Sequence, residues 1–176
     1  MVTLEDAKAH LRVTHELEDE LIESLIHAAY AMAETRCGRI FQDIEKTIHL
    51  DRLPDGRIPI HLPITPVQEI ISFEYIAEDD STQVIDPEDL ILDKRPLYPV
   101  LVPKDDVWPH AKLGIQHIEI VLQAGFKETP HDIRAAILLI IGHLYFNREA
   151  VTQNTVAELP MGVDFILTAH SIPRLG

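Results

Sequence analysis

The sequence has few of the residues that build reactive or metal-binding sites. Its single cysteine, Cys37, can form no internal disulfide and has no partners for a thiolate metal site, so we interpret it as a small buried residue. The seven glycines form no phosphate-binding or dinucleotide-binding loop, and no serine lies in a Gly-x-Ser-x-Gly turn. The ten histidines include no His-Glu-x-x-His and no His-x-His spacing. We therefore expect no enzymatic activity, no metal and no cofactor.

The charge and hydropathy of the chain argue against two further classes of partner. Fifteen Lys and Arg residues stand against 29 Asp and Glu residues, a formal net charge of -14. Because binding to a phosphate backbone depends on cationic side chains that release counterions, we expect no specific nucleic-acid binding. The longest apolar stretch is shorter than the about 20 residues that cross a bilayer, and the first residues lack the pattern of a secretion signal. We expect no membrane association.

Helical patterns occupy both ends of the chain. Residues 3–13 have Thr3 as a helix N-cap, acidic residues in the first turn and one apolar face. A longer amphipathic helix is predicted from after Thr14 to about Cys37, where Gly38 ends it. A last short helix with one apolar face is predicted to begin at about Pro160.

The most apolar stretch is the helix predicted from Pro130 to Val151. Thr129 is placed to cap it, Pro130 suits the first helical position, and Asp132 favours the positive end of the helix dipole. Apolar residues lie on nearly all of its sides. We expect either the rest of the chain or neighbouring subunits to cover it.

Between Thr47 and Phe126 the apolar residues alternate as they do in β-strands. The segments 48–50 and 58–62 alternate on either side of a Pro-Asp-Gly turn, which predicts a hairpin. Prolines concentrate here, which favours short strands in a small antiparallel sheet. The predicted fold class is α+β in a single domain, 1–176. It has a helical core of about four helices, from residues 1–46 and 127–176, and a small antiparallel β insertion, 47–126, between helices two and three.

Five motifs spread from end to end of the chain. They are L-E-D-A-K-A-H-L-R-V at 4–13, E-T-R-C-G-R at 34–39, P-I-T-P-V-Q-E-I at 63–70, P-H-D-I-R-A-A-I-L-L-I-I-G-H-L-Y-F-N-R-E-A-V at 130–151 and L-P-M-G-V-D-F-I-L at 159–167. With these motifs the chain resembles the head-tail connector (adaptor) proteins of tailed bacteriophages and prophages. The most specific signal is H-L-Y-F-N-R-E followed by L-P-x-G-V.

The resemblance implies a structural protein without catalytic residues. Connectors of this family form a homo-oligomeric ring, commonly of twelve subunits, which joins the phage portal protein to a head-completion or tail-side protein and lets DNA pass through its lumen. It implies a location in the virion neck, with the host cytoplasm as the place of assembly. Shorter relatives lack most of the β region, so the role of the insertion stays open.

Three groups of residues are candidates for the contacts of such a ring. Charged and polar residues around the apolar helix are candidates for the subunit interface, or pair within their own chain: Arg134, Asn147, Arg148 and Glu149. Acidic residues at the start of helix two are candidates for the lumen wall, or simply favour a helix N-terminus: Glu16, Glu18, Asp19, Glu20 and Glu23. Residues of the last helix are candidates for docking on the portal: Leu159, Pro160, Val163, Phe165, Ile166 and Leu167.

Two alternatives remain open from the sequence. One is another neck component, such as a head-completion protein, which the identity of its binding neighbour would distinguish. The other is a small cytosolic hydrolase whose His and carboxylate residues come together from distant parts of the chain. A pocket with converging His and carboxylate side chains, or a bound metal, would indicate that enzyme.

Overall fold

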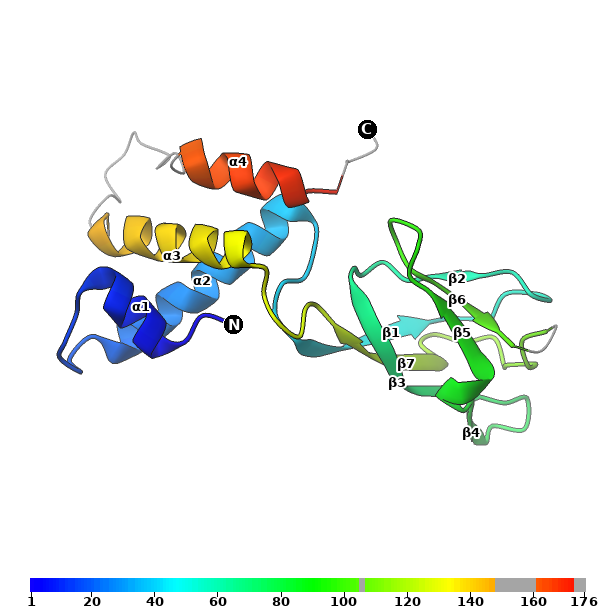
Figure 1. The fold of residues 1–176 in the computed structure, drawn as a ribbon. Helices are drawn as coiled ribbons and strands as arrows, with labels where there is room; N and C mark the ends of the chain where they lie inside the picture. The colour runs from blue at the N-terminus through cyan, green and yellow to red at the C-terminus, as the bar shows by residue number, and fades with distance from the viewer. Residues whose placement is uncertain (105–106, 148–160, 173–176) are drawn as a thin grey trace, which may run out of the picture. The chain divides into compact units, whose positions relative to one another are not determined.

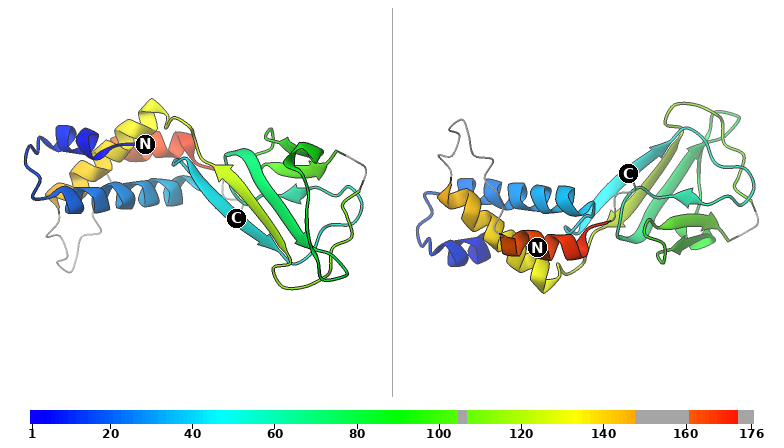
Figure 2. Two further views of the ribbon diagram at one scale, coloured as in Figure 1. Left: turned by 90° about the horizontal axis from the view of Figure 1, so that it is seen from below. Right: turned by 90° about the horizontal axis from the view of Figure 1, so that it is seen from above.

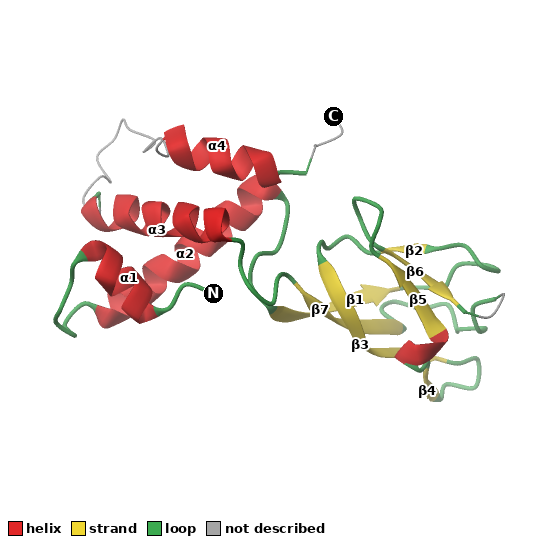
Figure 3. Cartoon of the chain, in the orientation of Figure 1, coloured by secondary structure: helices red, strands yellow, loops and turns green. Residues whose placement is uncertain are grey.

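The computed structural model describes residues 1–104, 107–147 and 161–172. The chain divides into two compact units: Met1–Gln42 with Lys127–Gly176, which we call the helical unit, and Asp43–Phe126, which we call the β unit (Figure 1). All the described α-helices belong to the first and all the described strands to the second (Figure 3). The predicted α+β class is confirmed, with four α-helices and two small antiparallel sheets among the described residues.

The four helices are α1 (Leu4–Leu11), α2 (Asp19–Cys37), α3 (His131–Phe146) and α4 (Met161–His170). The Thr3 cap is confirmed: its hydroxyl accepts from the Asp6 N–H, and the Asp6 carboxylate accepts from the Thr3 N–H, which forms a capping box. Gly38 ends α2 in the left-handed conformation, with φ 68°. This geometry is the reason for a glycine there.

Two helix boundaries differ from the prediction. The second helix begins at Asp19, so Glu16 and Glu18 precede it. Thr129 does not cap α3. Pro130 itself is the N-cap, with extended backbone at φ -51° and ψ 142°, so the helix begins at His131. The predicted continuation of α3 over 148–151 lies outside the described residues.

The core of the helical unit lies around α3, which α1, α2 and α4 contact (Figures 1 and 2). Ile133, Ile137 and Ile140 are fully buried there, and each such side chain contributes about 1.5–3 kcal/mol of hydrophobic free energy. The described residues do not cover α3 completely. Leu139 is partly exposed and Phe146 is 75% exposed, so part of the predicted cover is absent from the described chain.

The β unit contains two antiparallel sheets. The first has the order β1-β7-β3-β4, and the second β2-β6-β5. A short 3-10 helix, η1, precedes β5. The elements are β1 (Ile44–Leu50), β2 (Ile60–His61), β3 (Val67–Ile76), β4 (Thr82–Val84), η1 (Pro87–Asp89), β5 (Leu90–Asp93), β6 (Val100–Pro103) and β7 (Ile118–Ala124).

The predicted hairpin between residues 48–50 and 58–62 is wrong. Strand β1 pairs with β7, with Ile48 opposite Ile120, and β2 pairs with β6. Alternation of apolar residues indicates which face of a strand is buried, but it does not indicate which strand pairs with it. Here the pairing joins the first and last strands of the insertion. The interior of the unit contains Phe73 stacked on Trp108, with ring centroids 5.8 Å apart.

Candidate functional site

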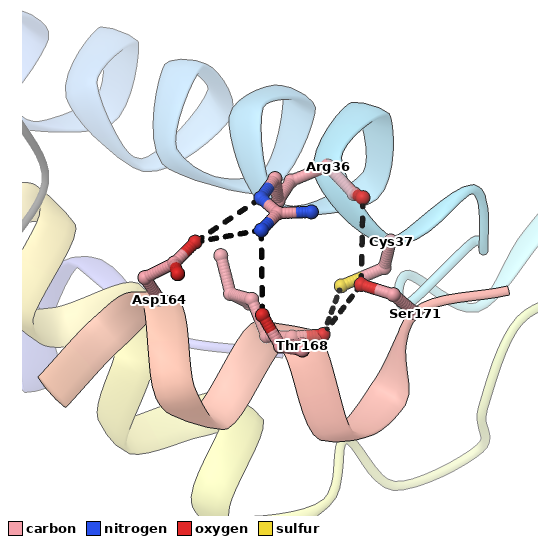
Figure 4. Close-up of polar contacts among 6 residues, drawn as sticks. Arg36, Cys37, Asp164, Thr168 and Ser171 are labelled. Carbon is pink, nitrogen blue, oxygen red and sulfur yellow. Dashed lines mark hydrogen bonds and ion pairs between the residues drawn. The ribbon is translucent and has the colours of Figure 1, made fainter. Parts of the chain in front are cut away.

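Helix α4 is fastened to the end of α2 by a group of polar contacts (Figure 4). The Arg36 guanidinium donates to the Asp164 carboxylate at 2.8 Å and to the Thr168 hydroxyl at 3.3 Å. The Cys37 thiol donates to the Leu167 carbonyl at 3.2 Å, and the Ser171 hydroxyl donates to the same carbonyl at 2.8 Å. These contacts give a structural role to Arg36 and Cys37 of the E-T-R-C-G-R motif.

Burial completes the attachment of α4. Val163 and Leu167 are fully buried, and so is Cys37, as predicted. Burial raises the pKa of the Cys37 thiol, which therefore stays a neutral S–H donor. On the other side, His170 lies 2.6 Å from Asp132 of α3, and this hydrogen bond lowers the pKa of the Asp132 carboxyl.

The predicted portal-docking residues divide between two faces of α4. Val163 and Leu167 belong to the core, Ile166 is half-buried, and Phe165 is 80% exposed. Leu159 and Pro160 lie outside the described residues. Sequence reasoning missed Met161, which is 91% exposed one turn before Phe165. A helical wheel of α4 shows this second apolar face, because residues four apart share one side of a helix.

The predicted interface residues have partners within their own chain wherever the structure describes them. Arg134 pairs with Asp6 at 2.7 Å, and the Asn147 side chain donates to the His143 carbonyl at 2.8 Å. The alternative of pairing within the chain is thus realised for both residues. Arg148 and Glu149 lie outside the described residues.

The predicted lumen-wall residues fall into two groups. The Glu18 carboxylate accepts from the Tyr145 hydroxyl, and Asp19 pairs with Lys8 at 2.6 Å, so both link elements of the helical unit. The other three carboxylates are exposed, and none of them pairs with another described residue. These are Glu16, Glu20 and Glu23.

Asp6 connects the start of α1 to α3, and this role predicts a pH dependence. The Thr3 N–H and the Arg134 guanidinium lower the pKa of the Asp6 carboxyl below its ordinary 3.8. Such a carboxylate stabilises the fold above the ordinary pKa, and its contribution is lost as the pH falls through the lower folded value. We expect Asp6→Asn to lower Tm at about pH 7, and the Tm difference from wild type to shrink as the pH falls below the ordinary pKa of 3.8.

Thermal unfolding of wild type and Asp6→Asn across this pH range measures the effect. Glu5→Gln is the matched control, since Glu5 lies beside Asp6 in the first turn of α1 and is exposed. A Tm difference between Asp6→Asn and wild type that stays constant down to the acid end would contradict the assignment.

Among the described residues no group of three or more His, Cys, Asp or Glu side chains is arranged to hold a metal ion. No described helix is both long enough and apolar enough to span a membrane.

Comparisons with known proteins agree with the motifs. Residues 1–73 match the family model described as the phage gp6-like head-tail connector protein. The comparison with curated proteins found no match.

Solved structures of gene transfer agent (GTA) particles share the fold. A chain from the neck of an empty GTA particle, computed with C6 symmetry, is 20% identical with a TM-score of 0.78, covering 98% of this chain and 90% of that chain. A chain of the native GTA virion is 20% identical with a TM-score of 0.77 and the same coverage. A chain from the native GTA neck, computed with C12 symmetry, is 19% identical with a TM-score of 0.74, covering 99% of this chain and 93% of that chain.

The family match over residues 1–73 agrees with the resemblance drawn from the motifs, and over nearly its whole length the chain has the fold of chains from the GTA neck structures.

Proposed function

We propose that this protein is a structural neck protein, which forms a ring between the portal and the head-completion or tail-side protein of a phage-like particle. DNA passes through the lumen of the ring, and the protein carries no catalytic activity. The observation that carries the proposal is the connector-family match over residues 1–73, together with the fold shared with proteins of neck structures that have C6 and C12 symmetry.

Exposed apolar residues on the helical unit support assembly with other chains. A closed ring needs a heterologous interface, in which two different faces of the subunit meet. Leu139 and Phe146 are exposed on α3, and Met32 is partly exposed on α2. These side chains supply exposed apolar area on two different helices. They add to the polar interface candidates of α3, such as Arg134. Arg148 and Glu149 remain part of the proposed interface.

The lumen wall is proposed at the start of α2. Glu16, Glu20 and Glu23 are exposed, and no described residue pairs with them or neutralises their charges. Negative charge along the wall keeps the DNA phosphates from binding and lets the genome slide. Glu18 keeps its negative charge while it accepts from the uncharged Tyr145 hydroxyl, whereas the charge of Asp19 is offset by Lys8.

The test is electron microscopy of the purified protein with and without its portal, together with a mass measurement in solution. We expect a ring, commonly of twelve subunits, stacked on the portal, with Glu20 and Glu23 facing the lumen. A protein that binds only the tail-side partner would be a head-completion protein instead. A ring with these carboxylates on its outer surface would exclude the proposed lumen wall.

A further inference from the structure

The hairpin formed by β5 and β6 has two unlike ends. In the register of the pair Leu90 lies opposite Pro103 at one end, and Asp93 lies opposite Val100 at the other (Figure 1). Strands rise about 3.3 Å per residue, so the two ends are about 10 Å apart along β5. Each end carries a different surface, and neither surface is used by the contacts described above.

At the Leu90 end the β unit has a hollow with a volume of about 360 Å³. Its walls are aromatic and aliphatic, and two carboxylates stand among them. Asp86 caps η1 by accepting from the Glu88 N–H at 2.8 Å, while no described residue pairs with the side chain of Asp89. We call this hollow the acidic hollow. The lining residues used in the argument are Tyr75, Val84, Ile85, Asp86, Asp89 and Trp108.

At the other end residues 94–99, K-R-P-L-Y-P, form the hairpin tip. Leu97 and Tyr98 are exposed, and the Arg95 side chain is 90% exposed. The Arg95 guanidinium donates to Asp93 through Nε at 2.9 Å and through Nη2 at 2.7 Å, which fixes the group while leaving Nη1 for a second carboxylate. Arginine and tyrosine are the residue types that most often anchor protein interfaces.

We propose that the hairpin tip of one subunit docks in the acidic hollow of a second copy of this chain. The inference rests on the proposed ring. It gives the β insertion a role as a contact surface for the neighbouring subunit. The tip and the hollow occupy opposite ends of one short hairpin, so they do not meet within a subunit. Two unlike faces that complement each other give the head-to-tail contact from which rings are built.

The opposite charges of the hairpin tip and the acidic hollow indicate that a second copy of the chain occupies the hollow. In a chain of net charge -14, neighbouring copies repel each other, and a contact between copies must lower that repulsion locally. At the tip Lys94 donates to the uncharged Gln68 carbonyl and Arg95 pairs with Asp93, so residues 93–95 together keep a net positive charge. Asp86 and Asp89 make the hollow acidic. Tyr98 and Leu97 also suit the apolar part of the hollow, because Tyr75, Val84 and Trp108 line it.

A charge swap tests the docking. Arg95→Glu and Asp89→Lys should each raise the concentration needed for half-maximal assembly by at least tenfold, and the double variant should return it to within about threefold of wild type. Circular dichroism and Tm show first that each variant is folded. Wild-type assembly by both single variants, or a double variant no better than the worse single one, overturns the proposal.

Cross-linking tests the orientation directly. Tyr98→Cys and Val84→Cys chains, each in full-length protein, are mixed in concentrated solution and oxidised; the natural Cys37 is buried and stays unreactive. Cross-linked dimers are expected from the mixture at least tenfold above either variant alone. Their absence from concentrated protein overturns the docking even where microscopy shows a ring. If cross-links form but microscopy shows no ring, the docking stands and the proposed function fails.

Discussion

Replacing Leu167 with alanine is expected to lower the free energy of unfolding by about 2–5 kcal/mol, the range found for large-to-small substitutions in protein cores. The Leu167 side chain is fully buried, so its truncation leaves a cavity in the core. The Leu167 carbonyl accepts from both Cys37 and Ser171, which holds α4 in place around that cavity. Denaturant unfolding followed by helical circular dichroism measures the change.

The control for this substitution is Phe165→Ala on the same helix. Phe165 is 80% exposed, so its removal should change the unfolding free energy by less than about 0.5 kcal/mol. Equal effects of the two substitutions would mean that α4 does not pack on α2 and α3 as described.

Replacing Phe165 with aspartate is expected to weaken binding to the portal by more than tenfold without lowering Tm. An aromatic anchor that becomes buried in an interface contributes about 2 kcal/mol or more, and each 1.4 kcal/mol is a factor of ten in affinity. Burying an unpaired carboxylate in its place adds a further penalty. Co-sedimentation of the protein with purified portal measures the loss.

Ile115→Asp is the matched control for the portal experiment. Ile115 is 85% exposed and lies in the β unit, so the control adds the same charge at an equally exposed apolar site. Portal binding by Phe165→Asp at the wild-type level would remove the outer face of α4 from the proposed docking surface. A loss shared by both variants would point to a general effect of charge.

The sequence predicted the helices well because their signals are local. Thr3 with Asp6 three residues later specifies the start of α1, and Gly38 specifies the end of α2, through contacts within one turn of chain. Thr129 is an exception. Its side chain suits an N-cap, but Pro130 has extended backbone, with φ -51° and ψ 142°, and is itself the N-cap.

The pairing of the strands depends on contacts that no local pattern contains. Ile48 and Ile120 face each other across β1 and β7, although more than half the insertion separates them in sequence. A turn signal between two alternating segments favours a hairpin, and here the segments belong to different sheets. Such choices are made by the packing of the whole unit around Phe73 and Trp108.

The candidate site was predictable in kind but not in detail. The residue types indicated that α4 has an apolar face. Only the fold shows that Val163 and Leu167 are buried in the core, whereas Phe165 and Met161 are exposed. The pairing of Arg36 with Asp164 joins residues 128 positions apart, and that of Arg134 with Asp6 links two helices. Charge patterns cannot select one partner among so many carboxylates.

The pairing of β1 with β7 also bears on how an insertion of this size is tolerated. With Ile44 opposite Ala124, the chain enters and leaves the β unit on neighbouring strands, about 4.8 Å apart. The entropic cost of closing a loop grows only slowly with its length, and here the ends are held together by the loop's own sheet. For the helical unit, the whole insertion is therefore equivalent to a tight turn, which allows the β unit to vary in length or sequence while the helices keep their fold.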